Sequence, residues 1–172
     1  MAQRFLARVS GETKQVEASV TSAGVSDAGK IPALDSSGKL DMSMMPAGIG
    51  ADTQIIPASE SLSAGNFVNI FSDSGDVKVR KADNSNGRPA DGYVLDAVAS
   101  AANATVYPLD GTNSELTGLT PGAKYWLGTA GGVTPTPLDE TDAGNANKIS
   151  QYLGKAKSAT ELITTDDGYV VL

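Results

Sequence analysis

Two stretches in the later part of the chain repeat the same order of residues, and this repetition limits the folds the chain can adopt. LSAGNFVNI, residues 62–70, matches LTPGAKYWL, residues 119–127, at an offset of 57. YVLDAVAS, which begins at Tyr93, parallels YLGKAKSA, which begins at Tyr152, at an offset of 59. Two matches in one order at nearly one offset indicate an internal duplication of about 57 to 59 residues.

Each copy has the same pattern: a Gly-containing turn, an alternating apolar run, a Gly-rich hairpin, a variable loop and further runs. Alternation of apolar and polar residues over four to eight positions predicts β-strands. VLDAVASAA, residues 94–102, could also form a helical turn by propensity, but Asn103 and the second copy favour strand and loop. We expect strands at 67–71, 77–81, 93–99 and 105–109 in the first copy, and at 125–127, 133–136, 149–156, 161–164 and 169–172 in the second.

The composition agrees with a β-rich fold, because 19 Gly and 8 Pro in 172 residues imply frequent turns. We therefore predict a mainly β protein: a small β-barrel or sandwich built from two duplicated β units that close on one core. An extended N-terminal arm, residues 1–52, precedes this domain. The duplicated β domain spans residues 53–172, with units at about 59–111 and 117–172.

The arm has too few apolar residues to form a core of its own. RFLARVSGETKQVEASV alternates around Ser10 and Gly11 and predicts two short strands, and the following residues to 52 are rich in Gly, Ser, Ala and Pro. Three Met in a short element are more often packing material than part of a cofactor site. We expect the arm to bind another subunit through its larger apolar side chains: Phe5, Ile31, Leu34, Leu40, Met42, Met44 and Met45.

GVSDAGKI, residues 24–31, has the glycine and lysine spacing of a phosphate-binding loop. Such a loop needs a hydroxyl residue after the lysine and a helix whose N–H groups face the phosphates. Ile31 and Pro32 occupy those positions instead, and the turn-forming LDSSGK follows. We therefore expect no nucleotide binding at Lys30.

Charge and missing residue types exclude several classes of function. The net charge is −7 and no long Lys/Arg run occurs, which argues against nucleic-acid binding. The chain has no Cys and no His, so thiolate chemistry, Cys-based metal sites and histidine acid–base catalysis are absent. No apolar run approaches the roughly 18 residues of a membrane span. We expect no enzyme activity, no cofactor and no membrane partner.

Acidic pairs and one aromatic pair are the remaining candidate sites. Asp139 with Glu140 and Asp166 with Asp167 could suggest a glycosidase, but adjacent residues of a strand point to opposite faces, so solvated loop charge is the simpler interpretation. The turns DSSGKLD and SDSGD lack the ligand spacing of a calcium loop. Whichever of Tyr125 and Trp126 points outward, with Trp126 the first choice, is a candidate contact residue.

The stretch AGKIPALDSSGKLDMSMMP resembles a G-K-(I/V)-x-x-L-D-x-x-G-K-(I/L)-D pattern, followed by a small apolar S-M-(M/L)-P, that recurs in structural proteins of tailed-phage virions. The downstream pattern, from AGNFVNI through LTPGAKYWLG to QYLGKAKSATELI, is similar to phage capsid decoration (cement) proteins and related head-fibre modules. The resemblance covers most of the chain from Ala28 onward. It implies a β-rich, non-catalytic protein on the virion surface.

The same resemblance implies specific partners. Decoration proteins bind the outside of an assembled shell where major capsid subunits meet, often as trimers, and commonly through an extended N-terminal arm. The major capsid protein and further copies of this chain are therefore the expected partners. The alternative is a tail-fibre, head-fibre or baseplate component that attaches by its arm and contacts host glycans. The loops DNSNGRPADG and LDETDAGNANK contain no aromatic residue, which favours the cement function.

Overall fold

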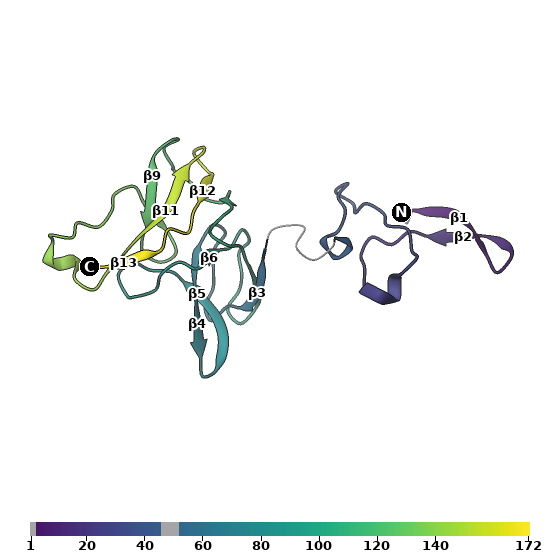
Figure 1. Ribbon diagram of the computed structural model, residues 1–172, viewed down its shortest axis with the longest axis horizontal. Helices are drawn as coiled ribbons and strands as arrows, with labels where there is room; N and C mark the ends of the chain where they lie inside the picture. The colour runs from purple at the N-terminus through teal and green to yellow at the C-terminus, as the bar shows by residue number, and fades with distance from the viewer. Residues whose placement is uncertain (1–2, 46–51) are drawn as a thin grey trace. The chain divides into compact units, whose positions relative to one another are not determined.

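The computed structural model describes residues 3–45 and 52–172 (Figure 1). The chain divides into two compact units, Met1–Gly50 and Ala51–Leu172, called here the N-terminal unit and the β-domain. The described residues contain β-strands and three short 3-10 helices and no α-helix, so the fold is mainly β, as the sequence predicts. None of the described helices is long and apolar enough to cross a membrane.

The N-terminal unit begins with a hairpin of β1 (Arg4–Val9) and β2 (Glu12–Glu17), in which Phe5 lies opposite Val16. Ser10 and Gly11 both have positive φ, 54° and 85°, as a tight two-residue turn between twisted strands requires. This confirms the two predicted strands. The rest of the unit consists of loops with two 3-10 helices, η1 (Gly24–Asp27) and η2 (Met42–Met44).

The β-domain contains eleven described strands in two halves. The first half has β3 (Gln54–Pro57), β4 (Phe67–Asp73), β5 (Asp76–Lys81), β6 (Gly92–Tyr93) and β7 (Asn103–Val106). The second half has β8 (Thr112–Asn113), β9 (Lys124–Leu127), β10 (Val133–Thr134), β11 (Ile149–Ala156) and β12 (Leu162–Thr164). The 3-10 helix η3 (Ala143–Asn145) precedes β11, and β13 (Tyr169–Val171) pairs with the start of β11.

The two halves have the same strand order. In the second half the order is β10-β9-β11-β12-β8. In the first half β5 pairs with β4, β4 with β6, and β7 with β3, while an antiparallel bridge between Tyr93 and Tyr107 joins β6 to the residue that follows β7. The first half therefore has the order β5-β4-β6-β7-β3, in which each strand occupies the place of its counterpart five strands later.

Backbone hydrogen bonds repeat in detail between the halves. The Leu62 N–H donates to Val98 O at 2.9 Å, and the Leu119 N–H donates to Ala159 O at 3.0 Å. The N–H of Gly65 donates to the carbonyl of Val94, as that of Gly122 does to Ala156. Leu62 and Leu119 are therefore equivalent, as the sequence match predicts.

The second sequence match is displaced by three residues. Phe67 pairs with Tyr93 in the first half, and the equivalent pair in the second half is Lys124 with Lys155. Tyr93 therefore corresponds to Lys155 and not to Tyr152. A β-bulge between Tyr152 and Gly154 and a longer preceding loop account for the shift, because both insert residues before the equivalent pair.

Two clusters of buried hydrophobic residues form the core. The smaller cluster lies inside the first half and includes Leu62, Val68 and Val79. The larger cluster joins the halves, because Phe67 and Tyr93 of the first half share it with Leu127, Leu153 and other residues of the second. The second half thus covers an aromatic face of the first.

The boundaries of some strands differ from those expected. The expected strand 93–99 ends at Tyr93, and residues 94–102 form turns with one bridge, Leu62 to Val98, instead of a strand or a helix. Strands β3 and β8 are absent from the sequence-based assignment. Each has two to four residues and pairs with a strand about 50 residues later in the chain, so no local pattern reveals it.

Candidate attachment surface

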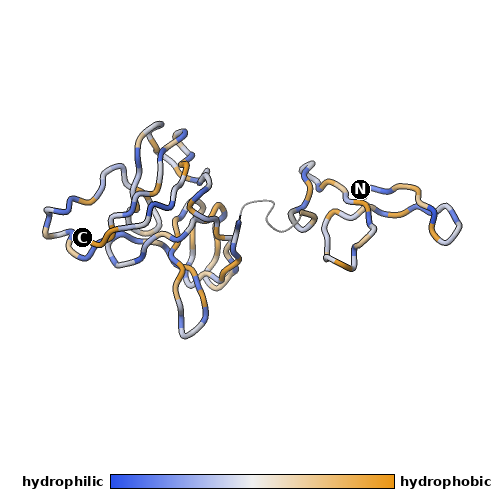
Figure 2. The backbone as a smooth tube through the Cα atoms, in the orientation of Figure 1, coloured by the Kyte–Doolittle hydropathy of each residue, from blue (hydrophilic) through white to orange (hydrophobic). Residues whose placement is uncertain are grey.

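Hydrophobic side chains of the N-terminal unit are exposed to solvent. Of its described residues only Ala33 is buried, at 7% exposure, and both buried clusters lie wholly in the β-domain. Leu34 is 52% exposed, Ile31 47% and Leu40 40%. Figure 2 shows apolar residues distributed along β1, β2 and the loops of this unit without a common centre. A fold with so little burial of apolar surface gains little hydrophobic stabilisation.

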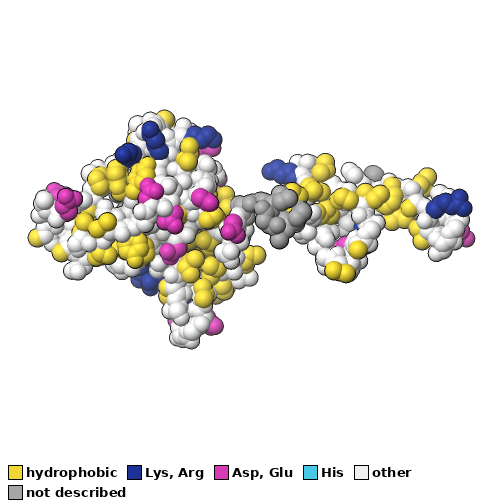
Figure 3. Space-filling view, in the orientation of Figure 1, with side chains coloured by type: hydrophobic (Ala, Val, Ile, Leu, Met, Phe, Trp, Pro, Cys, Tyr) yellow, Lys and Arg dark blue, Asp and Glu magenta, His cyan; other side chains and the backbone are white. Residues whose placement is uncertain are grey.

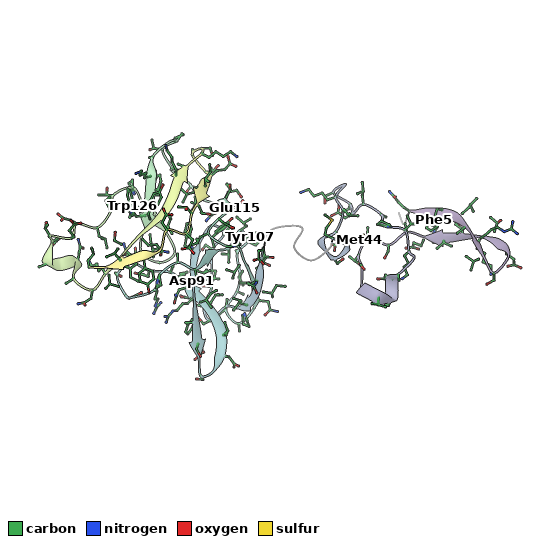
Figure 4. All side chains as sticks on the ribbon, viewed as in Figure 1. Phe5, Met44, Asp91, Tyr107, Glu115 and Trp126 are labelled. Carbon is green, nitrogen blue, oxygen red and sulfur yellow. The ribbon has the colours of Figure 1, made fainter. Side chains whose placement is uncertain are left out.

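The structure places the other predicted contact residues in the same unit. Phe5, on β1, lies half-buried opposite its hairpin partner Val16, and Met44, the last residue of η2, is also half-buried (Figure 4). Met45, which follows η2, is half-buried as well. The backbone of Met42 lies in η2, and its side chain falls outside the described set.

The predicted residues do not form a single cluster. Leu34 lines a hollow of about 260 Å³ together with Val20 and Ala33, whereas Met44 lines a different hollow of about 180 Å³ with Lys30 and Pro32. Which side chains contact a partner stays a prediction.

Sequence reasoning did not single out two of the most exposed apolar residues. Leu6 is 74% exposed on β1 and Val25 is 93% exposed in η1. Phe5 and Leu6 point to opposite faces of the hairpin, as neighbours on a strand do. Because a two-stranded hairpin without a core has no inner face, alternation alone could not show that both faces carry apolar contacts.

Polar loops hold the N-terminal unit together in place of a core. Asp35 Oδ1 accepts hydrogen bonds from the Lys39 N–H at 2.9 Å and from the N–H and hydroxyl of Ser37, both at 2.8 Å. The Lys39 N–H, followed by the Ser37 hydroxyl, holds the pKa of Asp35 below its usual value. This Asx-type turn closes the loop that carries Leu34 and Leu40.

A second Asp-Ser turn connects distant segments. Asp41 Oδ1 accepts from the Ser43 hydroxyl at 2.6 Å and from the Ser43 N–H at 2.9 Å, and these bonds hold the pKa of Asp41 below its usual value. The Ser43 hydroxyl oxygen accepts in turn from the Ser22 N–H at 2.8 Å. Ser43 thereby fixes η2 to the chain 21 residues earlier.

The phosphate-loop sequence adopts another structure. Lys30 forms an ion pair with Asp27, three residues earlier. The chain then runs extended, because the Ser19 N–H donates to Ile31 O at 2.9 Å and the Ala33 N–H donates to Ser19 O at 2.7 Å. No helix begins at residues 31–33, where a phosphate-binding loop would need one. The Lys30 N–H donates to Asp27 O and the Ala33 N–H to Ser19 O, so neither faces a phosphate.

Charge separates the two units. Residues 1–50 contain five Lys and Arg and five Asp and Glu, whereas residues 51–172 contain eight and fifteen. The whole net charge of −7 therefore lies on the β-domain, and the N-terminal unit is neutral. Copies of a neutral unit can associate without the charge repulsion that copies of an acidic unit would meet.

The acidic pairs serve as turn residues. Asp139 Oδ1 accepts from the Thr141 N–H and hydroxyl, and Asp142 accepts from the Gly144 N–H at the start of η3. Asp167 accepts from the Thr165 hydroxyl. Among the described residues no group of three or more acidic side chains could hold a metal ion.

Comparison with known proteins gives one similar structure. No protein-family model and no curated protein matches the chain. The N base of the head fiber gp8.5 of bacteriophage phi29 is similar to it, with a TM-score of 0.44 and 12% sequence identity over 67% of this chain and 95% of that chain. Similarity at this level does not establish a shared fold or function.

Proposed function

We propose that the chain is a structural protein of a tailed-phage virion, which binds the outside of the assembled capsid through its N-terminal unit and stabilises contacts between major capsid subunits. The observation that carries this proposal is the contrast between the units. The β-domain encloses two buried clusters, whereas the N-terminal unit buries only Ala33 among its described residues. The sequence resemblance to capsid decoration and head-fibre proteins implies that the partner is the major capsid protein.

The hairpin of the N-terminal unit offers a second type of contact. Strands β1 and β2 pair only with each other among the described residues, so each has a free edge. A free edge can add to the sheet of a partner through main-chain hydrogen bonds, while side chains such as Leu6 fill apolar pockets. An isolated hairpin is marginally stable in water, so docking on a partner would stabilise it.

In this proposal the protein is a homo-oligomer without enzyme activity or cofactor. The β-domains carry all of the net negative charge and repel one another, so copies would meet at the neutral N-terminal units. The resemblance to decoration proteins implies a trimer. Light scattering on the full chain and on residues 52–172 tests this: a trimer is expected for the first and a monomer for the second, and a monomeric full chain would contradict the proposal.

Sedimentation with capsids tests the attachment. The full chain and a variant that lacks residues 1–50 are mixed separately with purified particles that lack this protein, and bound protein is measured in the pellet. The full chain should saturate the particles and the shortened chain should remain in the supernatant, with circular dichroism showing that its β-domain is folded. Full occupancy by the shortened chain would show that the β-domain makes the contact.

Two single variants provide a matched comparison. Leu34→Ser removes an apolar side chain that is 52% exposed in the N-terminal unit, and Val77→Ser removes one that is 56% exposed on β5. Burial of a Leu side chain contributes about 1.5 to 3 kcal/mol, so Leu34→Ser should weaken capsid binding roughly tenfold or more. Val77→Ser should leave it unchanged. If the two variants changed capsid binding equally, Leu34 would not lie in the interface.

A further inference from the structure

One face of the second half carries aromatic and basic side chains outside both buried clusters. Trp126 on β9 lies opposite Tyr152 on β11, and Lys124 lies opposite Lys155 on the same two strands. Residues opposite each other in an antiparallel pair share a face, so these four side chains form one surface, called here the aromatic-lysine face. The bulge between Tyr152 and Gly154 returns Lys155 to this face.

The two rings are partly exposed. Their centroids are 5.6 Å apart with an angle of 61° between the planes, an edge-to-face arrangement. Both side chains are half-buried, and the Lys124 Nζ lies 5.9 Å from the centroid of the Tyr152 ring. Thr134 lies opposite Trp126 on β10, and Ser150 precedes Tyr152 by two residues on β11, so hydroxyl groups flank the rings.

The charge of this face differs from that of its domain. The β-domain has a net charge of −7, yet Lys124 and Lys155 lie opposite each other, and neither forms an ion pair with a carboxylate in the described part of the chain. Like charges directly opposite in a sheet are destabilising. In Figure 3, Lys and Arg side chains lie beside hydrophobic ones over the end of the domain that holds β9 and β11.

The positions of Lys124 and Lys155 differ in residue type and in burial from the equivalent positions in the first half. The equivalents of Lys124 and Lys155 in the first half are Phe67 and Tyr93, which are 0% and 3% exposed because the second half covers them. No described segment covers the second half in the same way, since Lys124 and Lys155 are both exposed. At these two positions the second half therefore presents lysines to solvent, where the first half has buried aromatic residues.

We propose that the aromatic-lysine face binds an acidic oligosaccharide. The C–H face of a sugar ring packs against Trp126 or Tyr152, because the aromatic face is electron-rich and attracts the partly positive C–H groups. The carboxylate of the sugar accepts charge-assisted hydrogen bonds from Lys124 and Lys155. The flanking hydroxyl of Ser150 suits the polar groups of a sugar, whereas the Thr134 hydroxyl bonds to the backbone of Thr136. This site is separate from the N-terminal unit and does not depend on capsid attachment.

The fluorescence of Trp126 tests this proposal directly, because Trp126 is the single Trp of the chain. The full chain is titrated with hexagalacturonate and with its methyl ester, which has the same sugar rings without the charge. We expect a saturable change of emission with hexagalacturonate and at least roughly fivefold weaker binding of the ester. Lys124→Gln with Lys155→Gln should weaken hexagalacturonate binding about fivefold and remove the preference over the ester.

Lys78→Gln is the matched control, because it removes one positive charge from β5, away from the aromatic-lysine face. It should leave hexagalacturonate binding unchanged. An emission that does not change up to millimolar hexagalacturonate would overturn the proposal, as would equal affinity for the ester. Hexaglutamate is titrated in parallel: if it binds more tightly than hexagalacturonate and its binding depends on the same two lysines, the face binds an acidic protein segment and the proposal is wrong.

Discussion

The side chain of Gln151 exchanges two hydrogen bonds with the backbone of Ala90, 61 residues earlier in the chain. The Ala90 N–H donates to Gln151 Oε1 at 2.7 Å, and Gln151 Nε2 donates to Ala90 O at 2.8 Å. Both residues are buried, at 2% and 3% exposure. The Gln151 side-chain amide thus pairs with the Ala90 backbone as a neighbouring strand would, and it links the two halves. It satisfies the Ala90 N–H and C=O, which water cannot reach.

Gln151→Leu should strongly destabilise the β-domain. The substitution leaves the N–H and C=O of Ala90 without partners in a buried site, at about 1 to 3 kcal/mol for each group. Urea unfolding should show a loss of about 2 to 5 kcal/mol. Ser150→Ala, at the half-buried neighbouring position, is the control and should cost less than about 1 kcal/mol. A loss below about 0.5 kcal/mol for Gln151→Leu would show that this pair does not hold the halves together.

Asp83 should make stability depend on pH. Burial alone would raise its pKa, but hydrogen bonds from the Ser85 hydroxyl and N–H and from the Ala130 N–H, with the charge of Arg88, together lower the pKa below its usual value. A lowered folded-state pKa gives stability that is present above the unfolded pKa of about 3.9 and is lost as pH falls through the folded pKa.

Asp83→Asn should therefore reduce the free energy of unfolding by about 1 kcal/mol at pH 7, because Asp83 is only half-buried. The difference from the unsubstituted protein should shrink below about pH 4. Denaturant unfolding at several pH values measures it. Asp96→Asn removes the same charge from an exposed turn and should show neither effect. A gap between Asp83→Asn and the unsubstituted protein that stays constant down to pH 2.5 would contradict the pKa argument.

Gly154→Ala should be one of the most damaging glycine substitutions. Gly154 has a φ of 148°, and an added Cβ would lie 2.0 Å from the backbone oxygen of Ile163 on the paired strand β12. Backbone atoms must move to relieve this clash, so we expect a loss of about 3 kcal/mol or more in urea unfolding. Gly118→Ala, with a φ of 72° and no atom within 4 Å of the added Cβ, should cost only about 1 kcal/mol. Equal losses would show that strand contact at Gly154 is unimportant.

The two halves should unfold together. Leu62 is 3% exposed in the smaller cluster of the first half, whereas Trp126 lies in the second half. Leu62→Ala should cost about 2 to 5 kcal/mol, and the urea midpoint from Trp126 fluorescence should fall with that from circular dichroism. Val77→Ala, at a 56% exposed position, should shift neither midpoint. A Trp126 midpoint that Leu62→Ala leaves unchanged would show independent halves.

The sequence predicted those strands whose pattern is local. The hairpin of β1 and β2 and the strands β4, β5 and β11 lie where alternating residues and Gly-containing turns indicate them. Strand β8 has only Thr112 and Asn113, and its partner β12 lies about 50 residues later. Pairing of such short segments depends on the assembled sheet, so their residues alone could not reveal it.

The equivalence of residues in the duplication was only partly predictable. Leu62 and Leu119 share their place because the turns that follow them have equal lengths. Tyr93 and Tyr152 match by identity, yet the bulge near Gly154 and the longer loop place Lys155 at the position of Tyr93. A shared residue type is weaker evidence for equivalence than a shared hydrogen-bond pattern. An insertion changes the sequence offset between identical residues, but it leaves the pairing of the strands unchanged.

The candidate contact residues were predicted by type and region. Ile31, Leu34 and Leu40 stand out in sequence as large apolar residues in a segment too poor in them to form a core, and the structure leaves all three exposed. Leu6 was missed because alternation assigns it to an outer face, although neither face of its hairpin is covered by a core. The sequence also could not show that Trp126 and Tyr152 are neighbours, because their pairing depends on the register of β9 and β11.

The packing of the second half on the first has a consequence for assembly. A contact in which one repeat covers a surface that the next repeat also possesses can propagate, and the same interaction between separate chains would build a filament without end. The β-domain has two such repeats. In the second repeat, Lys124 and Lys155 occupy the positions of Phe67 and Tyr93, the aromatic residues of the first repeat against which the second repeat packs. Two exposed like charges at these positions therefore oppose the addition of a third repeat, or of a second chain, by the same contact.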